Sequence, residues 1–268
     1  MTNILRCPVC GKRFTQNSNT LLCPGHHCFD IAKEGYVNLL GGSRPGDRHG
    51  DSREMALSRR AFLNKGYYSP LAKAVGETLA QYVSSGAVLD ICCGEGYYTE
   101  ALAAGLPELD FYGFDISREM VRLAAKRKCG AKFFVANLAS IPVEDNSIQA
   151  AVHLFAPFNG EEFSRILAPG GVLLSVIPGK DHLMGLKKEL YDVPYENDEG
   201  EPQTWDLEIV QRVRVKSQIR LTSGEDILAL FRMTPYYFKT GAAAAEKLRS
   251  LSNLSTETEF IILVCRKN

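Results

Sequence analysis

Three cysteines and one histidine near the start of the chain have the spacing of a zinc site. The pattern is C-x2-C-x12-C-x3-H, and its members are Cys7, Cys10, Cys23 and His27. Thiolate and imidazole are the ligands that tetrahedral zinc prefers, and two cysteines separated by two residues can hold one ion from a tight turn. Four protein ligands leave no open coordination position. The sequence therefore predicts one structural Zn2+ rather than a catalytic one.

The fourth ligand of this site is not settled by spacing alone. His26 and Cys28 flank His27 in the segment CPGHHCFD, and each could reach the same ion. Metal binding is favoured over disulfides because four of the eight cysteines fall within the first 28 residues, and the start of the chain lacks the pattern of a secretory signal. We therefore expect a cytoplasmic protein whose thiols are reduced.

A second group of residues could bind a nucleotide. The segment VLDICCGEGYYT contains Gly94 and Gly96, which let the backbone pass close to a ligand. Asp115 follows about 20 residues later, where a carboxylate can accept hydrogen bonds from both hydroxyls of a ribose. Asn137 could contact an adenine, although a turn residue is the more ordinary role for an asparagine at that point.

These residues need a parallel sheet to bring them together. From residue 86 onward, short apolar segments alternate with helical ones, which is typical of a doubly wound α/β sheet. Ligands of such sheets bind beyond the carboxyl ends of the strands, so Gly94, Asp115 and Asn137 should meet at one edge. We expect strands at 87–92, 109–114, 131–135, 148–154 and 172–177, with helices at 96–104, 117–127 and 160–168. Two further strands, near 206–219 and 257–266, should lie around a helix at 224–232.

The length and composition allow one full-sized core and a small module. The chain has 268 residues, of which 45% are hydrophobic and 23% charged. We expect a zinc-binding module over 1–40, a basic linker with helices over 41–85, and a nucleotide-binding domain over 86–268. No apolar stretch approaches the roughly 20 residues that a membrane-spanning helix needs, so we expect no membrane contact.

Basic residues are concentrated in the first part of the chain. Residues 1–75 hold 11 Lys and Arg against 5 Asp and Glu, although the net charge of the whole chain is zero. A polyanion such as RNA would fit this region, while a merely solvated basic face would give the same count. We expect the cations of the segment 41–75 to contact RNA phosphates, with little effect on a bound cofactor. They are Arg44, Arg48, Arg53, Arg59, Arg60, Lys65 and Lys73, and a helix over 52–64 would display Arg53 and Arg60.

The glycine turn resembles the first motif of the class I S-adenosylmethionine methyltransferases. Cys92 stands where that motif usually has its first glycine, and the GxGxxG pattern of dinucleotide dehydrogenases is absent. The expected fold is therefore an α/β class I (Rossmann-like) methyltransferase with an N-terminal zinc-binding module. The positions that match the methyltransferase pattern are Asp90, Gly94, Glu95, Gly96, Asp115 and Asn137.

Motifs spread over most of the chain resemble a narrower family. The chain is similar, through about residue 192, to the bacterial 23S rRNA guanine-N1 methyltransferases of the RlmA type. The motifs are, in order, CPVCGKRF, CPGHHCFDIAKEGYVNLL, GDSREMALSRRAFLNKGYYSPL, LDICCGEGYYT, FAPF and PGKDHLMGLKKELY. This resemblance implies zinc ligands at Cys7, Cys10, Cys23 and His27.

The same resemblance implies a cofactor site and an assembly. It places Tyr68, Gly94, Glu95 and His182 around S-adenosylmethionine. It also implies a homodimer in which the zinc modules flank a basic cleft that holds a ribosomal RNA hairpin. From the residues alone, Tyr68 would be an ordinary core aromatic and His182 a polar residue at the start of a helix.

The implied reaction transfers a methyl group from a sulfonium to N1 of a guanine. N1 carries a proton at neutral pH, so the enzyme must remove or share that proton. No general base can be assigned, because the carboxylates and the imidazole near strand ends also suit solvated or capping roles. These candidates are Asp181, His182, Glu161 and Glu162, while Phe155 and Phe158 could either shelter a flipped base or belong to the core.

Two other functions remain compatible with the sequence. A small-molecule methyltransferase would keep the nucleotide-binding domain but would leave the zinc module and the basic first part of the chain without a role. A non-catalytic RNA-binding zinc protein would explain those two features and leave the glycine turn without one. Cofactor binding and methyl transfer to ribosomal RNA separate these possibilities.

Overall fold

A central sheet of parallel strands organises the molecule. The computed structural model describes residues 4–40, 53–240 and 242–268. The chain runs outward from a central strand in one direction and then crosses back to continue on the other side, so the strand order reverses next to β5. The parallel strands are, in spatial order, β9 (Leu167–Pro178), β8 (Ile148–Leu154), β5 (Gly86–Ile91), β6 (Leu109–Asp115) and β7 (Lys132–Val135).

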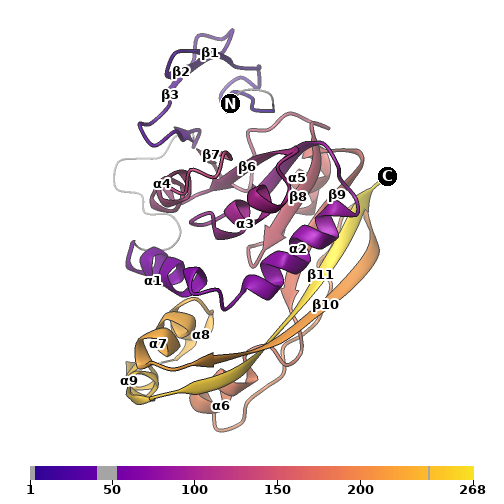
Figure 1. Ribbon diagram of the computed structural model, residues 1–268. Coiled ribbons are helices and arrows are strands. Elements are labelled where there is room, and N and C mark those ends of the chain that lie inside the picture. The colour runs from indigo at the N-terminus through magenta and orange to yellow at the C-terminus, as the bar shows by residue number, and fades with distance from the viewer. Residues whose placement is uncertain (1–3, 41–52, 241) are drawn as a thin grey trace.

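Further strands extend this sheet on both sides. A long antiparallel hairpin adds β11 (Leu254–Lys267) and β10 (Leu207–Leu221) beyond β9. Its far end carries α7 (Gly224–Arg232), α8 (Tyr236–Lys239) and α9 (Ala242–Ser250) (Figure 1). On the opposite side, β4 (Val37–Asn38) pairs in parallel with β7. The sheet thus has eight strands within the described residues.

Apolar side chains on both faces of the sheet explain why its strands are nearly continuous hydrophobic runs. In β5, every residue from Ala87 to Ile91 is buried, because neighbouring positions point into different clusters. Val88 packs into the core beneath the first helices, and Leu89 packs into the core beneath the zinc module. The helices are α1 (Arg53–Asn64), α2 (Ser69–Ala80), α3 (Tyr97–Gly105), α4 (Arg118–Ala125), α5 (Gly160–Ile166) and α6 (Met184–Leu190).

Local signals set several helix starts. The side chains of Ser117, Asn159 and Ser223 accept hydrogen bonds from backbone N–H groups in the first turns of α4, α5 and α7. Such caps satisfy donors that the helix itself cannot, and substitution by alanine typically costs about 1 kcal/mol. The predicted elements of the sheet are confirmed, and the observed ends differ by a few residues from those expected. The strand expected at 172–177 is longer, because the chain is already extended at Leu167.

The zinc module is continuous with the main sheet rather than tethered to it. It contains the small sheet of β1 (Thr15–Asn17), β2 (Thr20–Leu22) and β3 (Cys28–Asp30), and it lies over β7 and α4 (Figure 1). The backbone N–H of Arg6 donates to the carbonyl of Pro142 at 3.0 Å, and that of Leu39 donates to Val135 at 2.9 Å. The predicted module over 1–40 therefore contributes β4 to the sheet, which the sequence did not indicate.

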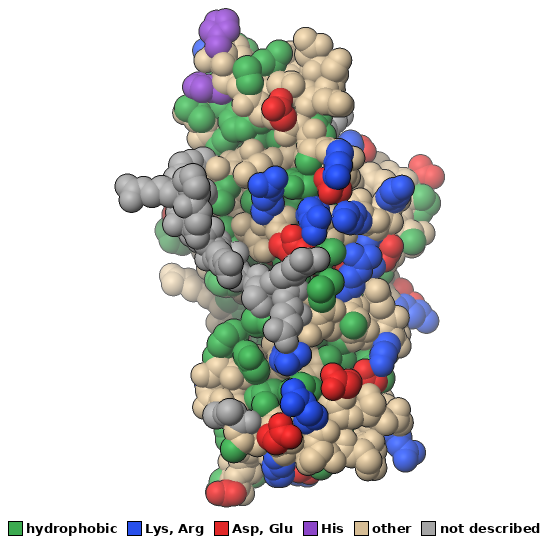
Figure 2. Space-filling view, turned by 90° about the vertical axis from the view of Figure 1, so that its left-hand side faces the viewer, with side chains coloured by type: hydrophobic (Ala, Val, Ile, Leu, Met, Phe, Trp, Pro, Cys, Tyr) green, Lys and Arg blue, Asp and Glu red, His purple; other side chains and the backbone are tan. Residues whose placement is uncertain are grey.

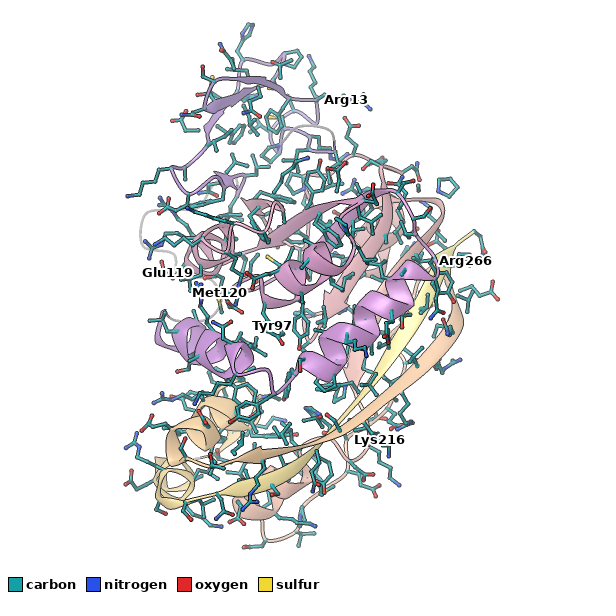
Figure 3. The ribbon with its side chains drawn as sticks, in the orientation of Figure 1. Arg13, Tyr97, Glu119, Met120, Lys216 and Arg266 are labelled. Carbon is teal, nitrogen blue, oxygen red and sulfur yellow. The ribbon has the colours of Figure 1, made fainter. Side chains whose placement is uncertain are left out.

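Charged contacts hold both ends of the N-terminal part. Arg13 of the zinc module pairs with Glu144 at 2.5 Å, and Arg13 is labelled in Figure 3. After α1, Lys65 pairs with Asp226 of α7 at 2.5 Å, and Tyr67 donates to the same carboxylate at 3.1 Å. The chain just after α1 is thus fixed against α7. No helix in the described parts of the chain is long and apolar enough to span a membrane.

Candidate cofactor and zinc sites

The predicted zinc ligands converge on one point. One ligand atom from each of Cys7, Cys10, Cys23 and His27 lies within 4.8 Å of all the others. His27 Nδ1 is 3.3 Å from the sulfur of Cys23 and 3.6 Å from that of Cys7. A tetrahedral zinc with bonds of ~2.0–2.3 Å separates its ligand atoms by roughly 3.3–3.8 Å. The donor set and its spacing therefore fit one zinc ion.

The backbone conformation indicates which of the two adjacent histidines is the fourth zinc ligand. His26 has a left-handed φ of 62° and an exposed side chain, while Cys28 is exposed at the start of β3. Neither belongs to the cluster of possible metal ligands. The N–H of His26 donates to the carbonyl of Cys23 at 2.9 Å, which closes a tight turn and directs His27 back toward the thiols. His27 is accordingly the histidine at the site.

The glycine turn after β5 adopts the left-handed conformations that its sequence suggested. Gly94 has φ 56° and Gly96 has φ 81°. A Cβ atom at Gly96 would lie 2.8 Å from the Cβ of Ala124, so only glycine lets α3 start this close to α4. Cys92, at the position of the first glycine of the pattern, also has a positive φ, 55°. The turn therefore keeps the expected geometry without that glycine.

Asp115 ties this turn to the end of the next strand. Its Oδ2 accepts from the N–H of Gly94 at 3.1 Å, and its Oδ1 accepts from the N–H of Ser117 at 2.8 Å. These two bonds fix the carboxylate at the carboxyl edge of the sheet, where ligands of doubly wound folds bind. Asp115 is therefore both a structural acceptor and a residue of the site.

Two adjoining cavities occupy this edge of the sheet. Tyr68, Asp90, Gly94, Glu95 and Asp115 line the first cavity, which also reaches Met120 and Met233. Asn137 lines the second. Cys92, Ile116 and Pro157 line both, so the two form one groove across the ends of β5, β6 and β8. The predicted meeting of these residues at one edge is observed.

Two residues of the predicted set lie outside the lining of the groove. Gly96 is needed for the packing of α3 against α4. His182 is buried beneath the first cavity, where its ring contacts Phe260, with centroids 4.5 Å apart, and Tyr68 at 6.4 Å. Its Nδ1 accepts from the N–H of Glu259 at 3.3 Å. A role of His182 in cofactor binding stays a prediction. His182 could act indirectly, because its ring contacts Tyr68, which lines the cavity.

Comparisons with known proteins bear on both sites. Residues 5–42 match the family described as RlmA, N-terminal, a zinc ribbon, and residues 88–171 match a methyltransferase domain family. The 23S rRNA (guanine(748)-N(1))-methyltransferase of Streptomyces fradiae is 37% identical to the chain over 186 residues, which are 68% of this chain and 66% of that protein.

A Micromonospora griseorubida protein is 35% identical over 206 residues, covering 69% of each chain. It is named a 23S rRNA (guanine-N(1)-)-methyltransferase by assignment rather than by demonstrated activity. The chain belongs to the RlmA family of methyltransferases. A Bacillus subtilis (strain 168) protein named in the same way is 28% identical over 280 aligned positions, covering 99% of this chain and 98% of the other. Like other methyltransferases of this fold, the RlmA-family protein uses S-adenosylmethionine.

The polar atoms of the first cavity fit the amino-acid end of this cofactor. Glu95 Oε1 and the Tyr98 hydroxyl are buried and have no hydrogen-bond partner among the described residues. Both residues line the cavity. A buried polar atom without a hydrogen-bond partner destabilises the folded state by about 1–3 kcal/mol. A bound ligand that hydrogen-bonds to these two atoms would account for their presence in the cavity. The ammonium and carboxylate groups of the cofactor offer a matching donor and acceptor.

Asp90 lies beneath the glycine turn and is almost completely shielded from solvent. It is 2% exposed, and its Oδ2 accepts from the Thr99 hydroxyl at 2.5 Å. Burial raises the pKa of Asp90 to about 7, with a further contribution from the charge of Asp115. Because its charged form is poorly solvated, a cation bound in the cavity would favour ionisation of Asp90.

Sequence reasoning missed the residues that connect the turn to distant helices. Arg127, just after α4, donates to the carbonyl and the carboxylate of Glu95, to Glu100, and to Asn64 of α1. Arg60 of α1 approaches the same Glu95 carboxylate at 4.0 Å. No local signal marks Arg127, because its partners are far apart in the sequence. The basic run KRKCG, residues 126–130, only indicates an exposed helix end.

The placement of α1 changes the expectation for its arginines. Arg59 lines the cofactor cavity, and Arg60 faces Glu95. Neutralising these two residues should therefore alter cofactor binding, contrary to the expectation that it would remain unchanged. Arg44 and Arg48 lie outside the described residues, as does the side chain of Arg53.

Replacement of the two adjacent histidines provides a matched test of the zinc site. His27→Ala should lower zinc affinity more than ~100-fold, because it removes one of four ligands. His26→Ala should keep one zinc per chain, since that ring is exposed and outside the cluster. Metal analysis after competition with a chelator measures both. Equal zinc content in the two variants would contradict the assignment.

Because the pKa of Asp90 is raised, the difference in folding stability between the wild type and Asp90→Asn should depend on pH. From its unfolded pKa of 3.8 to its folded pKa of about 7, the folded state retains a proton that the unfolded state has lost, so stability falls as pH rises. Asp90→Asn should remove this loss. We expect the variant to gain about 2–4 kcal/mol over the wild type between pH 4 and pH 7, with no further gain above. Urea unfolding of the cofactor-free protein across this range is the measurement, and a pH-independent difference would exclude the assignment.

The left-handed conformation of Cys92 reverses the usual order of two substitutions. Glycine is normally about 0.5–1 kcal/mol less stable than alanine, but a side chain at positive φ costs roughly 1–2 kcal/mol. Cys92→Gly should therefore be at least as stable as Cys92→Ala. At the neighbouring Cys93, which has no positive φ, the alanine variant should be the more stable one. Thermal unfolding of the four variants decides the point, and the same order at both positions would refute it.

Proposed function

We propose that this protein transfers a methyl group from S-adenosylmethionine to N1 of a guanine in 23S ribosomal RNA. The similarity to the Streptomyces fradiae methyltransferase of that specificity carries the proposal. Relatives that act on small molecules match less of the chain. A trans-aconitate 2-methyltransferase of Rhodopseudomonas palustris is 38% identical over 97 residues, or 34% of this chain. The zinc ribbon is thus part of what distinguishes the protein from small-molecule methyltransferases.

An exposed aromatic ring at the cofactor cavity supports a flipped base as the substrate. Phe155 follows β8, lines the first cavity and remains 46% exposed. Its φ of 57° is unusual for a bulky residue, and such strain is found where function requires it. A base that leaves its stack can be held against an aromatic face. Phe155 is accordingly our candidate for contact with the target guanine.

The loop that carries Phe155 is held by a buried histidine. His153 Nε2 donates to the carbonyl of Pro157 at 3.1 Å, and its Nδ1 accepts from the Ser175 hydroxyl at 3.1 Å. Burial lowers the pKa of His153, which keeps the ring neutral. Phe158, on the other side of Pro157, packs against Phe163 with ring centroids 5.0 Å apart. Phe158 packs against the core and lines the second cavity, whereas Phe155, whose ring lies 5.4 Å from that of Phe260, is the more exposed of the two rings.

The candidate general bases do not line the cofactor groove. His182 is buried, and burial lowers its pKa to about 3, so it is a poor proton acceptor at neutral pH. Although burial opposes the effect, hydrogen bonds from Arg165 and from the N–H of Ile141 lower the pKa of Glu162. Asp181 lies near Lys216, at 3.9 Å, beside a separate cavity. We therefore assign the chain the tasks of binding and orienting the guanine. The cofactor would supply the methyl group, and the N1 proton would leave to solvent as the N1–methyl bond forms and the sulfur–methyl bond breaks.

A basic surface near the cavity supports an RNA substrate. Arg118, Lys126 and Lys128 are exposed on or just after α4, between the zinc module and α1. Figure 2 shows Lys and Arg side chains distributed down this face, below the histidines of the zinc module. Such cations bind phosphates without reading sequence and position an RNA on the protein. The proposal includes a homodimer that holds an RNA hairpin in the cytoplasm, as the family resemblance implies.

Methyl transfer to unmodified 23S rRNA tests the proposal. Primer extension should stop at one guanine after incubation with S-adenosylmethionine, because an N1 methyl group blocks base pairing. Phe155→Ala should lower kcat/KM for RNA by ~10–100-fold, the range expected from loss of one stacking contact, whereas Phe155→Tyr should keep most activity. Cofactor affinity, measured separately, should fall less than kcat/KM for RNA in both variants, although Phe155 lines the same cavity. Absence of methyl incorporation into rRNA by the wild-type protein would overturn the proposal.

A further inference from the structure

The position of α1 places an arginine in the wall of the cofactor cavity. Arg59 and Leu63, one turn apart on α1, line the cavity together with residues of the glycine turn. Ala56 of the same helix is fully buried against Met120 and Leu123 of α4. The N–H groups of Arg127 donate to Asn64 at 3.0 Å at the other end of α1. These contacts fix the rotation of α1, so Arg59 is directed at the cavity by packing rather than by chance.

Tyr98 provides a second polar group at the same place. It is the second residue of α3, and its hydroxyl is the buried atom without a described partner noted above. Burial raises the pKa of Tyr98, and the positive charge of Arg59 partly opposes that rise. The same charge acts on Tyr68. Arg59, Tyr68 and Tyr98 line the same cavity, so one ligand could contact all three. Tyr97 and Met120, labelled in Figure 3, lie between α1 and the helices α3 and α4.

These groups divide by chemistry into donors and an acceptor. A guanidinium and a neutral phenol both donate hydrogen bonds, and Arg59 and Tyr98 line the same cavity. Glu95 Oε1, two residues before α3, accepts. An amino acid presents a carboxylate to donors and an ammonium to an acceptor, so its two charged groups match this arrangement. Asp115 lines the same cavity and Asn137 the adjoining one, and these two residues are left for the nucleoside.

We infer that Arg59 and Tyr98 bind the carboxylate of the amino-acid moiety of S-adenosylmethionine, while Glu95 receives its ammonium group. The inference rests on the cofactor and not on the identity of the RNA. It gives Arg59 a role different from the phosphate contact that the basic composition of its segment suggested. It also explains why a cation is tolerated in a cavity that binds a sulfonium, since the carboxylate would compensate the charge of Arg59.

Two ligands that differ in the amino-acid moiety test this assignment. S-adenosylhomocysteine carries the moiety, and 5′-methylthioadenosine lacks it while keeping the nucleoside and the sulfur. Arg59→Met should weaken S-adenosylhomocysteine binding by ~10–100-fold, as expected for loss of a charge-assisted contact, and Tyr98→Phe by ~5–10-fold. Binding of 5′-methylthioadenosine should change less than about threefold in either variant, which also shows that the site is folded. Calorimetry on the zinc-loaded full chain gives these affinities.

Lys73→Met is the matched control, because it removes an exposed cation of α2 that pairs with Glu77 at 3.7 Å, and it should bind both ligands as the wild type does. Equal weakening of both ligands, or unchanged S-adenosylhomocysteine affinity together with weaker RNA binding, would overturn the inference. A wild-type protein that binds both ligands but does not methylate rRNA would refute the proposed substrate and leave the assignment standing. A wild type that binds neither ligand would refute the cofactor itself.

Discussion

The cofactor site depends on a buried ion pair between Arg127 and Glu95. Their side chains are 4% and 1% exposed, and the guanidinium also reaches Glu100 of α3 and Asn64 of α1. Removing either partner would leave a charge without compensation in a poorly solvated environment, which typically costs 3–5 kcal/mol. The Arg127 side chain, just after α4, thus joins the turn after β5 to α1 and α3. Because α1 is held in this way, residues that are remote in sequence can complete the cavity wall.

The zinc site has a comparable structural role at the other side of the molecule. Leu5 and Leu21 of the zinc module belong to the same apolar cluster as Phe134 and Ile141 of the nucleotide-binding domain. The four metal ligands enclose a segment too small to fold around its own core. Zinc therefore stabilises the surface on which β4 joins the sheet, and its loss would expose part of the main core. The zinc ribbon and the methyltransferase domain thus share one apolar core at this junction.

Local sequence patterns predicted the turn, the strands and the metal ligands, because neighbouring residues determine those features. Gly94, Asp115 and the four zinc ligands are arranged by turns and strand ends that can be read directly. The choice of His27 over His26 depended on a single left-handed residue, which spacing does not encode. The roles of Arg59 and Arg127 depended on how α1 packs against α4, a contact between residues far apart in the chain. Composition alone therefore assigned Arg59 to RNA, while its position relates it to the cofactor.

The parallel pairing of β4 has a consequence for the order in which the protein assembles. Val37 pairs with Phe134, and Leu5 forms a bridge with Val143, so each contact closes an interval of roughly a hundred residues or more. During synthesis the zinc ribbon leaves the ribosome well before the strand that it must join. It can take up its metal early, yet its apolar underside stays uncovered until β7 has formed. The metal-binding segment is thus made before the strand that it must join, and its docking waits for the roughly hundred residues up to the end of β7.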